Sequence, residues 1–144
     1  EETDLFEHAF APESGGEADW QIMPASTQQN APWMAELDRV IGGDNRVAYL
    51  RTNVISESEQ KVKLELGSDD GVKAWLNDEL VHANNVARGV TPGDDVVEIA
   101  LKAGDNILLL KIVQGGGGWG ACARIRNLDG GKAPGVKAAL VTEN

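Results

Sequence analysis

Apolar and charged residues alternate strictly over residues 61–66, and this pattern constrains the fold most strongly. Val62, Leu64 and Leu66 occupy every second position, and a charged residue precedes each of them. Because successive side chains of a β-strand point to opposite faces of the sheet, the segment predicts a half-buried antiparallel strand. We therefore expect a sheet with one face packed and the other in water.

The same signals predict more strands further along the chain. Segments rich in strand-forming residues stand at 46–54, 72–77, 80–82, 96–101, 106–113 and 119–126. Turn-forming clusters such as Gly67–Gly71 separate them. Residues 61–82 are expected to form a three-stranded meander. Residues 106–113 are expected to form a central strand buried on both faces, with residues 119–126 as its partner.

The first 45 residues are less regular. Asp4–Phe6 and Trp20–Met23 are expected to supply edge strands. Apolar residues at helical spacing between Pro32 and Gly42 predict one short helix, since these two residues are suited to begin and end it. Short strands without alternating helices indicate an all-β, antiparallel β-sandwich of the jelly-roll kind.

The length of 144 residues suits a single domain. We divide it into irregular N-terminal strands and a loop (1–45), the main sandwich (46–129) and an exit segment (130–144) that either packs back or trails off. The chain begins without Met and without an apolar leader, so we expect a processed protein or a piece of a longer one.

The charge balance narrows the classes of partner. With 23 acidic and 13 basic side chains, the formal net charge is −10. Such a surface repels phosphate backbones and anionic lipids, so neither nucleic acid nor a membrane is expected as a partner. The single cysteine, Cys122, excludes an internal disulfide and is expected to be a small buried residue.

Recognisable catalytic motifs are absent from the sequence. It contains neither a Gly-x-Ser-x-Gly elbow nor a His-Glu-x-x-His motif, and the two histidines, His8 and His82, are far apart. The chain is therefore not expected to be an enzyme.

Residues 67–77, which read Gly-Ser-Asp-Asp-Gly-Val-Lys-Ala-Trp-Leu-Asn, carry a family resemblance. The stretch resembles the Ser-Asp-Asp-Gly-Val-x-x-Trp signature of jelly-roll accessory modules in exported bacterial proteins of planctomycete type. The similarity extends from about Arg46 to Asp129. It implies a β-sandwich and a carbohydrate-binding role beside polysaccharide-active domains of the same protein, in an extracellular or periplasmic location.

Asp69 and Asp70 have two interpretations. A similar Asp-Asp pair holds calcium in the sugar-binding domains of yeast adhesins, so the resemblance implies Ca²⁺ as an optional metal on these two carboxylates, and no cofactor is required. Calcium takes six to eight oxygen ligands, and carboxylates with loop carbonyls begin such a set. The alternative is that both aspartates accept backbone N–H bonds in a turn.

The candidate sugar ligands are two tryptophans and one polar loop. Trp119 stands between glycines and Trp75 is out of phase with its apolar neighbours, so each is a candidate plate for the apolar face of a sugar, with burial in the core as the alternative. The loop supplies His82, Asn84, Asn85 and Arg88. Arg88 would grip a carboxylate bidentately, or else brace the loop.

Two functions therefore stay open. The first is a non-catalytic carbohydrate-binding module whose partner is a polysaccharide or oligosaccharide. The second is a structural or protein-interaction domain that spaces or docks a covalently linked neighbour, because aromatic residues make up only 5% of the chain.

Overall fold

The computed structural model describes residues 4–142, and the strands predicted from residue 46 onwards are present in it. Eight strands follow one another: β1 (Arg46–Ser56), β2 (Gln60–Asp69), β3 (Val72–Leu76), β4 (Glu79–Asn84), β5 (Asp95–Leu101), β6 (Gly104–Gln114), β7 (Gly120–Arg126) and β8 (Val136–Ala139). Strands β1–β7 each begin or end within a few residues of their expected positions, because alternation and turn residues are local signals, whereas no strand was predicted at β8.

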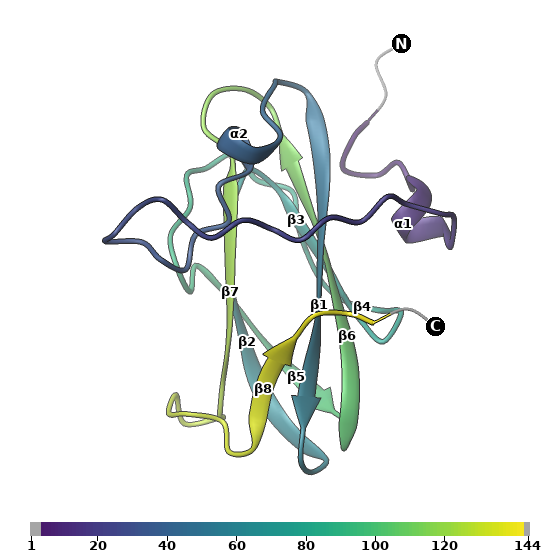
Figure 1. Cartoon of the computed structure of the whole chain (residues 1–144), viewed down its shortest axis with the longest axis vertical. Helices are drawn as coiled ribbons and strands as arrows, with labels where there is room; N and C mark the ends of the chain where they lie inside the picture. Colours follow the sequence, from purple (N-terminus) through teal and green to yellow (C-terminus); the bar gives the residue numbers. More distant parts are fainter. Residues whose placement is uncertain (1–3, 143–144) are drawn as a thin grey trace.

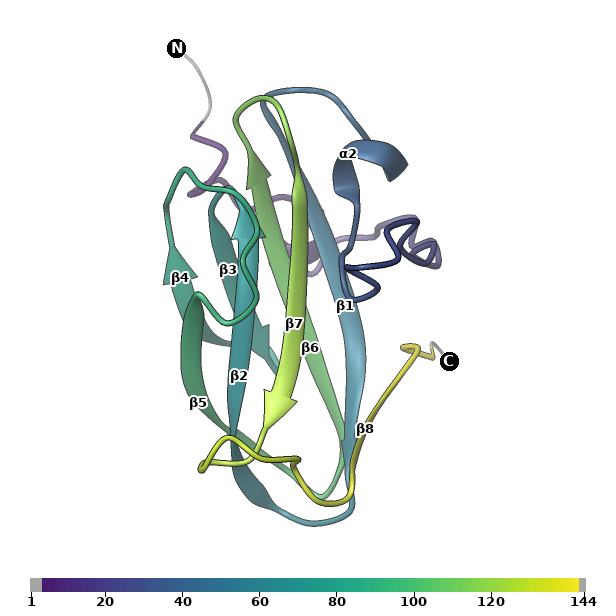
Figure 2. The ribbon, with the colours of Figure 1, turned by 90° about the vertical axis from the view of Figure 1, so that its left-hand side faces the viewer.

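The strands form two antiparallel sheets packed face to face, which confirms the all-β sandwich (Figures 1 and 2). The larger sheet has the order β4-β3-β6-β1-β8 and the smaller one β5-β2-β7. The pairs β1–β8, β2–β7 and β3–β6 are nested within one another, as in a long hairpin rolled up into a jelly roll.

The alternating residues of β2 form the centre of the core. Val62, Leu64 and Leu66 are buried on the inner face of the small sheet, and the large sheet contributes Leu110 and Ile112 of β6 to the same cluster. Full burial of such a side chain stabilises the fold by roughly 1.5–3 kcal/mol. The inner face predicted from the sequence is therefore the packed face.

Two predicted strand pairings are wrong. The turn between β2 and β3 crosses from the small sheet to the large one, so residues 61–82 do not form a meander, although β3 and β4 do form a hairpin. In the same way β7 pairs with β2 and not with β6. Alternation tells which face of a strand is apolar. It does not tell whether two strands with apolar faces lie side by side in one sheet or opposite one another in two sheets, because both arrangements bury these faces.

The predicted helix is shorter than expected. Helix α2 covers Leu37–Val40, because Ala35 is held extended by hydrogen bonds with Ala121 of β7 (N–O distances 2.8 and 3.2 Å). Gly42 follows with a positive φ of 74°, a conformation that glycine adopts without strain. A second short helix, α1 (Ala11–Ser14), was not expected from the pattern.

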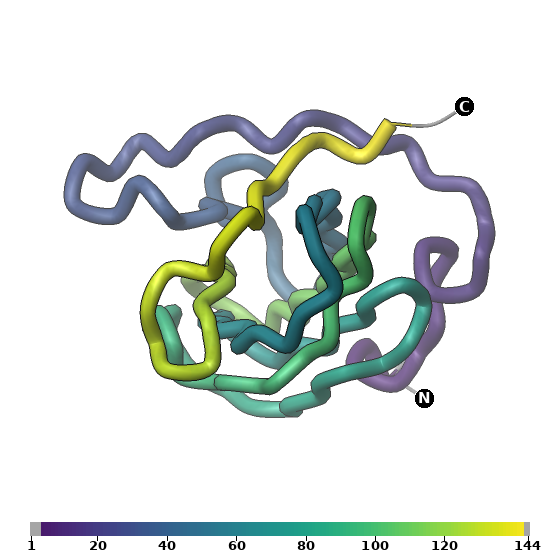
Figure 3. The backbone as a smooth tube through the Cα atoms, turned by 90° about the horizontal axis from the view of Figure 1, so that it is seen from below, coloured from purple at the N-terminus to yellow at the C-terminus, as the bar shows by residue number. Residues whose placement is uncertain are grey.

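No strand precedes β1 within the described residues, so the two predicted N-terminal edge strands are wrong. This segment instead crosses the outside of the sandwich (Figures 1 and 3). Lys111 of β6 fixes it there: the fully buried ammonium donates to the carbonyls of Phe6 (2.9 Å) and His8 (2.7 Å) and pairs with Glu13 (2.7 Å). Tyr49 also donates to Glu13.

The exit segment packs back onto the sandwich. Val136–Ala139 forms β8 at the edge of the large sheet, where Val54 lies opposite Ala138 in an antiparallel register with β1.

β6 is the middle strand of the large sheet, as expected from its apolar run.

Candidate functional site

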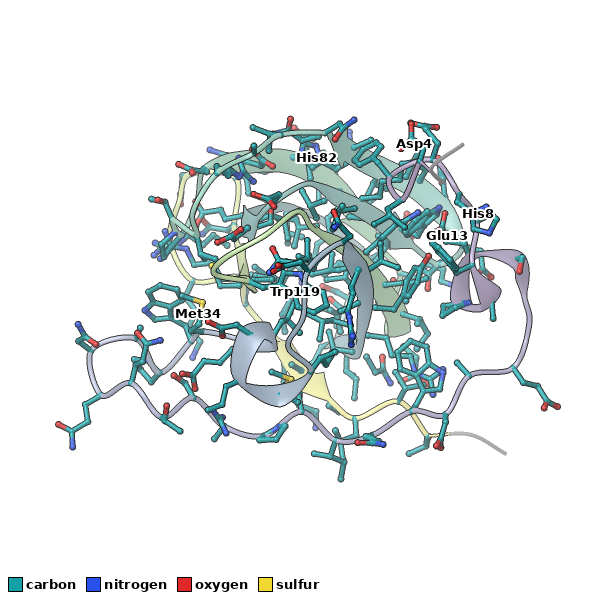
Figure 4. The ribbon with its side chains drawn as sticks, turned by 90° about the horizontal axis from the view of Figure 1, so that it is seen from above. Asp4, His8, Glu13, Met34, His82 and Trp119 are labelled. Atoms are coloured by element: carbon teal, nitrogen blue, oxygen red, sulfur yellow. The ribbon has the colours of Figure 1, made fainter. Side chains whose placement is uncertain are left out.

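A shallow pocket of about 180 Å³ lies at the end of the sandwich where α2 and the β6–β7 loop meet. Figure 4 shows two of its residues, Met34 and Trp119, at this end. Its lining is acidic and carries no basic side chain: Gln28, Met34, Glu36, Asp38, Asp69, Val90, Gly118, Trp119 and Gly120. We call it the loop-end pocket.

Glu36 holds the irregular segment around this pocket. Its carboxylate accepts hydrogen bonds from the backbone N–H (2.6 Å) and hydroxyl of Thr27, from Gln28 (3.3 Å) and from Arg39 (3.2 Å). The bond from the Thr27 backbone is the largest cause that lowers the pKa of Glu36, to about 2. An ionised Glu36 therefore positions Gln28 at the pocket wall.

Trp119 is not the exposed plate considered above. Its side chain is buried, with 2% of the residue exposed, and it belongs to the core cluster. The glycines before it bend the chain so that the indole turns inward, where its large apolar area is removed from water. Trp119 Nε1 and Gln114 Oε1 are the buried side-chain polar atoms that lack a hydrogen-bond partner in the described part of the chain.

Asp70 has the local role that turn aspartates often have. One of its oxygens accepts the backbone N–H of Arg88 (3.1 Å) and the other that of Gly115 (2.8 Å). It thereby ties two loops to the end of β2.

Asp69, the other carboxylate of the pair, is half-buried and lines the loop-end pocket. Partial burial raises its pKa to about 6, and the negative charges of Asp70 and Asp38 act in the same direction. Asp69 is therefore ionised at neutral pH but gains a proton in mildly acidic solution.

Asp69 and Asp70 were the candidate metal ligands. Residues 4–142 contain no group of three or more His, Cys, Asp or Glu side chains placed to hold a metal ion. Asp70 already accepts backbone N–H groups at both oxygens, which leaves Asp69 as the carboxylate of the pair open to a cation. Ca²⁺ binding at Asp69 and Asp70 stays a prediction.

Three of the predicted ligand residues come together, but around Asp95 rather than around a pocket. Asp95 starts β5 and is buried, and it accepts hydrogen bonds from His82 (3.0 Å), Asn84 (3.2 and 3.3 Å) and Arg88 (2.9 Å to each oxygen). The bonds from Arg88 are the largest cause that lowers the pKa of Asp95, to about 2, and those from His82 and Asn84 act in the same direction.

Arg88 is therefore a brace for its loop. Besides Asp95, its guanidinium donates to the carbonyl (3.0 Å) and hydroxyl (2.9 Å) of Ser68. These partners engage the guanidinium nitrogens that would bind the carboxylate of a uronic acid. The prediction that Arg88 binds a ligand carboxylate is therefore wrong, and its alternative, a brace for the loop, is what the structure shows. Asn85 is exposed, and Trp75 lies half-buried on the outer face of β3, away from the core.

Sequence reasoning missed the residues that line the loop-end pocket from the N-terminal segment. Gln28, Met34 and Asp38 belong to it, and Trp33, next to Met34 in the chain, is 44% exposed. Trp20, by contrast, lies under the guanidinium of Arg51, 4.0 Å from the ring centre. The one signal in the sequence for this part of the pocket was the run Pro-Trp-Met. It lies in a segment without strand-like alternation, so no pattern assigned its aromatic residue to the core.

Comparisons with known proteins identify the class of fold. No family model matches the sequence, and no curated protein matches it. A solved structure described as a family 35 carbohydrate binding module from an environmental isolate is similar, with a TM-score of 0.50 and 16% identity over 69% of this chain and 76% of that one.

A second solved structure is an anti-sigma factor domain-containing protein, with a TM-score of 0.53 and 17% identity over 72% of this chain. The match spans 34% of that longer chain. At these identities the likeness shows the β-sandwich fold. Within the described residues, none of the helices has the length and apolar character needed to span a bilayer.

Proposed function

We propose that the chain is a non-catalytic carbohydrate-binding module and that the loop-end pocket is its sugar site. The observation that carries this proposal is a pocket lined by the carboxylate of Asp69 and by Met34, whose neighbour in the chain, Trp33, is 44% exposed. A carboxylate accepts hydrogen bonds from sugar hydroxyls, and an indole covers the apolar C–H face of a sugar ring. The sandwich fold shared with a known carbohydrate-binding module supports the same assignment.

The pocket favours glycans without carboxylate groups. Its lining includes Glu36, Asp38 and Asp69 but no lysine or arginine, so a uronic acid would meet only negative charge. With about 180 Å³, it is smaller than the roughly 300–1,000 Å³ of sites for larger ligands, and it suits one sugar ring at a chain end or branch.

The same proposal places the module in an exported protein, attached to a polysaccharide-active domain. A module of this kind adds affinity for the polysaccharide through a second point of attachment, so the linked domain stays near its substrate. Ca²⁺ is retained in the proposal as an optional metal at Asp69.

A glycan array tests this function. The folded chain is applied to neutral, amino-sugar and uronic-acid polysaccharides, with calcium and with a chelator, and hits are titrated by calorimetry. We expect binding to a glycan that lacks uronic acids and no binding to polyuronates. Trp33→Ala and Asp69→Asn should each weaken binding about tenfold or more, whereas Asp78→Asn, in the turn between β3 and β4, should leave it unchanged.

Other outcomes contradict the assignment in distinct ways. If Trp75→Ala abolishes binding and Trp33→Ala does not, the sugar site is on the outer face of β3. If a chain shown to be folded by circular dichroism binds no glycan in either buffer, the carbohydrate-binding function is wrong.

A further inference from the structure

The outer edge of β7 is paired near its two ends but not between them. Ala35 is hydrogen-bonded to Ala121 at one end, and an isolated bridge joins Arg126 to Lys132 at the other. Among residues 4–142, no strand pairs with this side of β7 from Cys122 to Ile125. That stretch of four residues is about 13 Å long at the usual strand rise.

The direction of the backbone groups follows from the pairing of Ala121. Because N–H and C=O groups alternate between the two sides of an antiparallel strand, Ala123 points both of its groups to the same outer side as Ala121. The N–H of Ile125 points there too. The open stretch therefore presents donors and an acceptor to an incoming strand.

A groove of about 300 Å³ runs beside this stretch, between the two sheets. The small sheet ends at β7, whereas the large sheet continues to β8, so no strand of the small sheet covers β8 (Figure 2). Buried core residues, namely Val54, Leu64 and Leu108, contribute to the groove lining. A strand added to β7 would extend the small sheet over β8 and cover this apolar surface.

The charge of the groove is opposite to that of the whole chain. Its lining contains three basic residues, Arg124, Lys132 and Lys137, and no acidic one, although the formal net charge of the chain is −10. Arg124 is paired with Glu65, whereas Lys132 and Lys137 are exposed at the rim. Acidic side chains would therefore be attracted to a small part of the surface.

We propose that this groove, which we call the β7 groove, binds an extended segment of a partner protein in which apolar and acidic residues alternate. The segment joins the small sheet as a fourth strand and takes its main-chain hydrogen bonds from Ala123 and Ile125. Its apolar side chains enter the groove, and its carboxylates lie near Lys132 and Lys137. The β7 groove shares no residue with the loop-end pocket, so this inference is independent of the sugar site.

A second copy of this chain fits the groove poorly. Pairing of two β7 edges would bring Arg124 and Arg126 of one copy next to the same residues of the other, and two chains of net charge −10 repel one another.

Binding of a synthetic peptide tests the proposal. The probe is a fluorescent, acetylated hexapeptide of alternating valine and glutamate, titrated by fluorescence anisotropy at low salt. Its controls are the valine–lysine peptide and a valine–glutamate peptide that is N-methylated at alternate residues. We expect saturable binding of the first peptide and none of the two controls. Amide NMR shifts should centre on Ala123 and Ile125.

Variants separate the contribution of charge from that of the edge. Lys132→Glu/Lys137→Glu should weaken binding at least tenfold, whereas the matched double variant Lys61→Glu/Lys102→Glu, with the same change in net charge, should change it less than twofold. Ala123→Pro removes an outward N–H that β2 does not use and should abolish binding while the circular dichroism spectrum is retained. If that variant fails to fold, the two glutamate variants and the N-methylated peptide still decide the question.

Several results would overturn the proposal. They are equal binding of the acidic and basic peptides, no binding of either, equal effects of the two double variants, or NMR shifts that map outside β7 and β8. Concentration-dependent dimerisation that the Ala123→Pro variant abolishes would show that the edge serves a second copy instead.

Discussion

At the scale of single residues, Asp69 carries a clear pH signature. Its pKa of about 6 in the folded chain lies above the value of about 4 for a free aspartate, so between these pH values the folded state binds a proton that the unfolded state has lost. The free energy of unfolding therefore falls as pH rises from 4 to 6, and the penalty persists at pH 7.

Asp69→Asn should remove this penalty. We expect the variant to be more stable than the parent at pH 7 by roughly 1 kcal/mol or less, because solvent screens a partly exposed carboxylate, and equally stable near pH 4. Urea denaturation of both proteins at several pH values measures the difference, with Asp78→Asn as the control. A difference that does not vary with pH would contradict the raised pKa.

Asp95 changes the free energy of unfolding with pH in the opposite direction. Its pKa of about 2 lies below that of the unfolded chain, so its contribution to stability is complete above about pH 4 and is lost as pH falls towards 2. Asp95→Asn leaves the guanidinium of Arg88 without its carboxylate and should destabilise the fold by about 3 kcal/mol at pH 7.

The neighbouring Asp94 provides a matched control, because it lies 4.0 Å from the same guanidinium but is much more exposed. Asp94→Asn should change the free energy of unfolding by less than about 0.5 kcal/mol. Chemical denaturation compares the two variants, and equal losses would show that Arg88 depends on local charge rather than on the bidentate pair.

At the scale of elements, the N-terminal segment and β6 depend on one another through Lys111. Lys111→Met leaves the buried carboxylate of Glu13 without its cation and two carbonyls without their donor, so we expect a loss of about 3–5 kcal/mol. The double variant Lys111→Met/Glu13→Gln should recover part of it, since no buried charge remains. Denaturant unfolding measures both.

The exposed Lys102 serves as the control for this series, because Lys102→Met removes the same charge from the surface and should have almost no effect. Limited proteolysis adds a local measurement: cleavage before α2 should become faster in Lys111→Met than in the parent. Unchanged cleavage together with unchanged stability would show that this segment does not depend on the ammonium.

At the scale of the whole molecule, local patterns predicted the strands but not the way in which they associate. The alternation at Val62, Leu64 and Leu66 identified a buried face, and that face is buried. The same alternation could not tell that β3 lies opposite β2 rather than beside it, because both arrangements bury the same residues. Long-range pairing is set by the packing of the complete sandwich.

The candidate site was predictable only in part for a related reason. Asp69 was singled out by its neighbour Asp70 and by its place in a turn. Of the four polar residues expected in one loop, His82, Asn84 and Arg88 lie together. Their common partner, Asp95, could not be recognised, since one buried acceptor satisfies donors that in a sequence resemble free ligands. Trp33 and Asp38 lie in a segment whose shape is fixed by Glu36, and no periodic pattern marks such a segment.

The buried ammonium of Lys111 also has a bearing on how such a domain is exchanged between proteins. The first strand begins at Arg46, but the carbonyls that solvate this cation belong to residues 6 and 8. A fragment cut at the first strand would lose both carbonyls and the carboxylate of Glu13, and this face of the sheet would be left uncovered around a charge without its protein partners. The smallest transplantable unit therefore includes the irregular leader, and a recombination point between residues 8 and 46 would yield two fragments that are each incomplete.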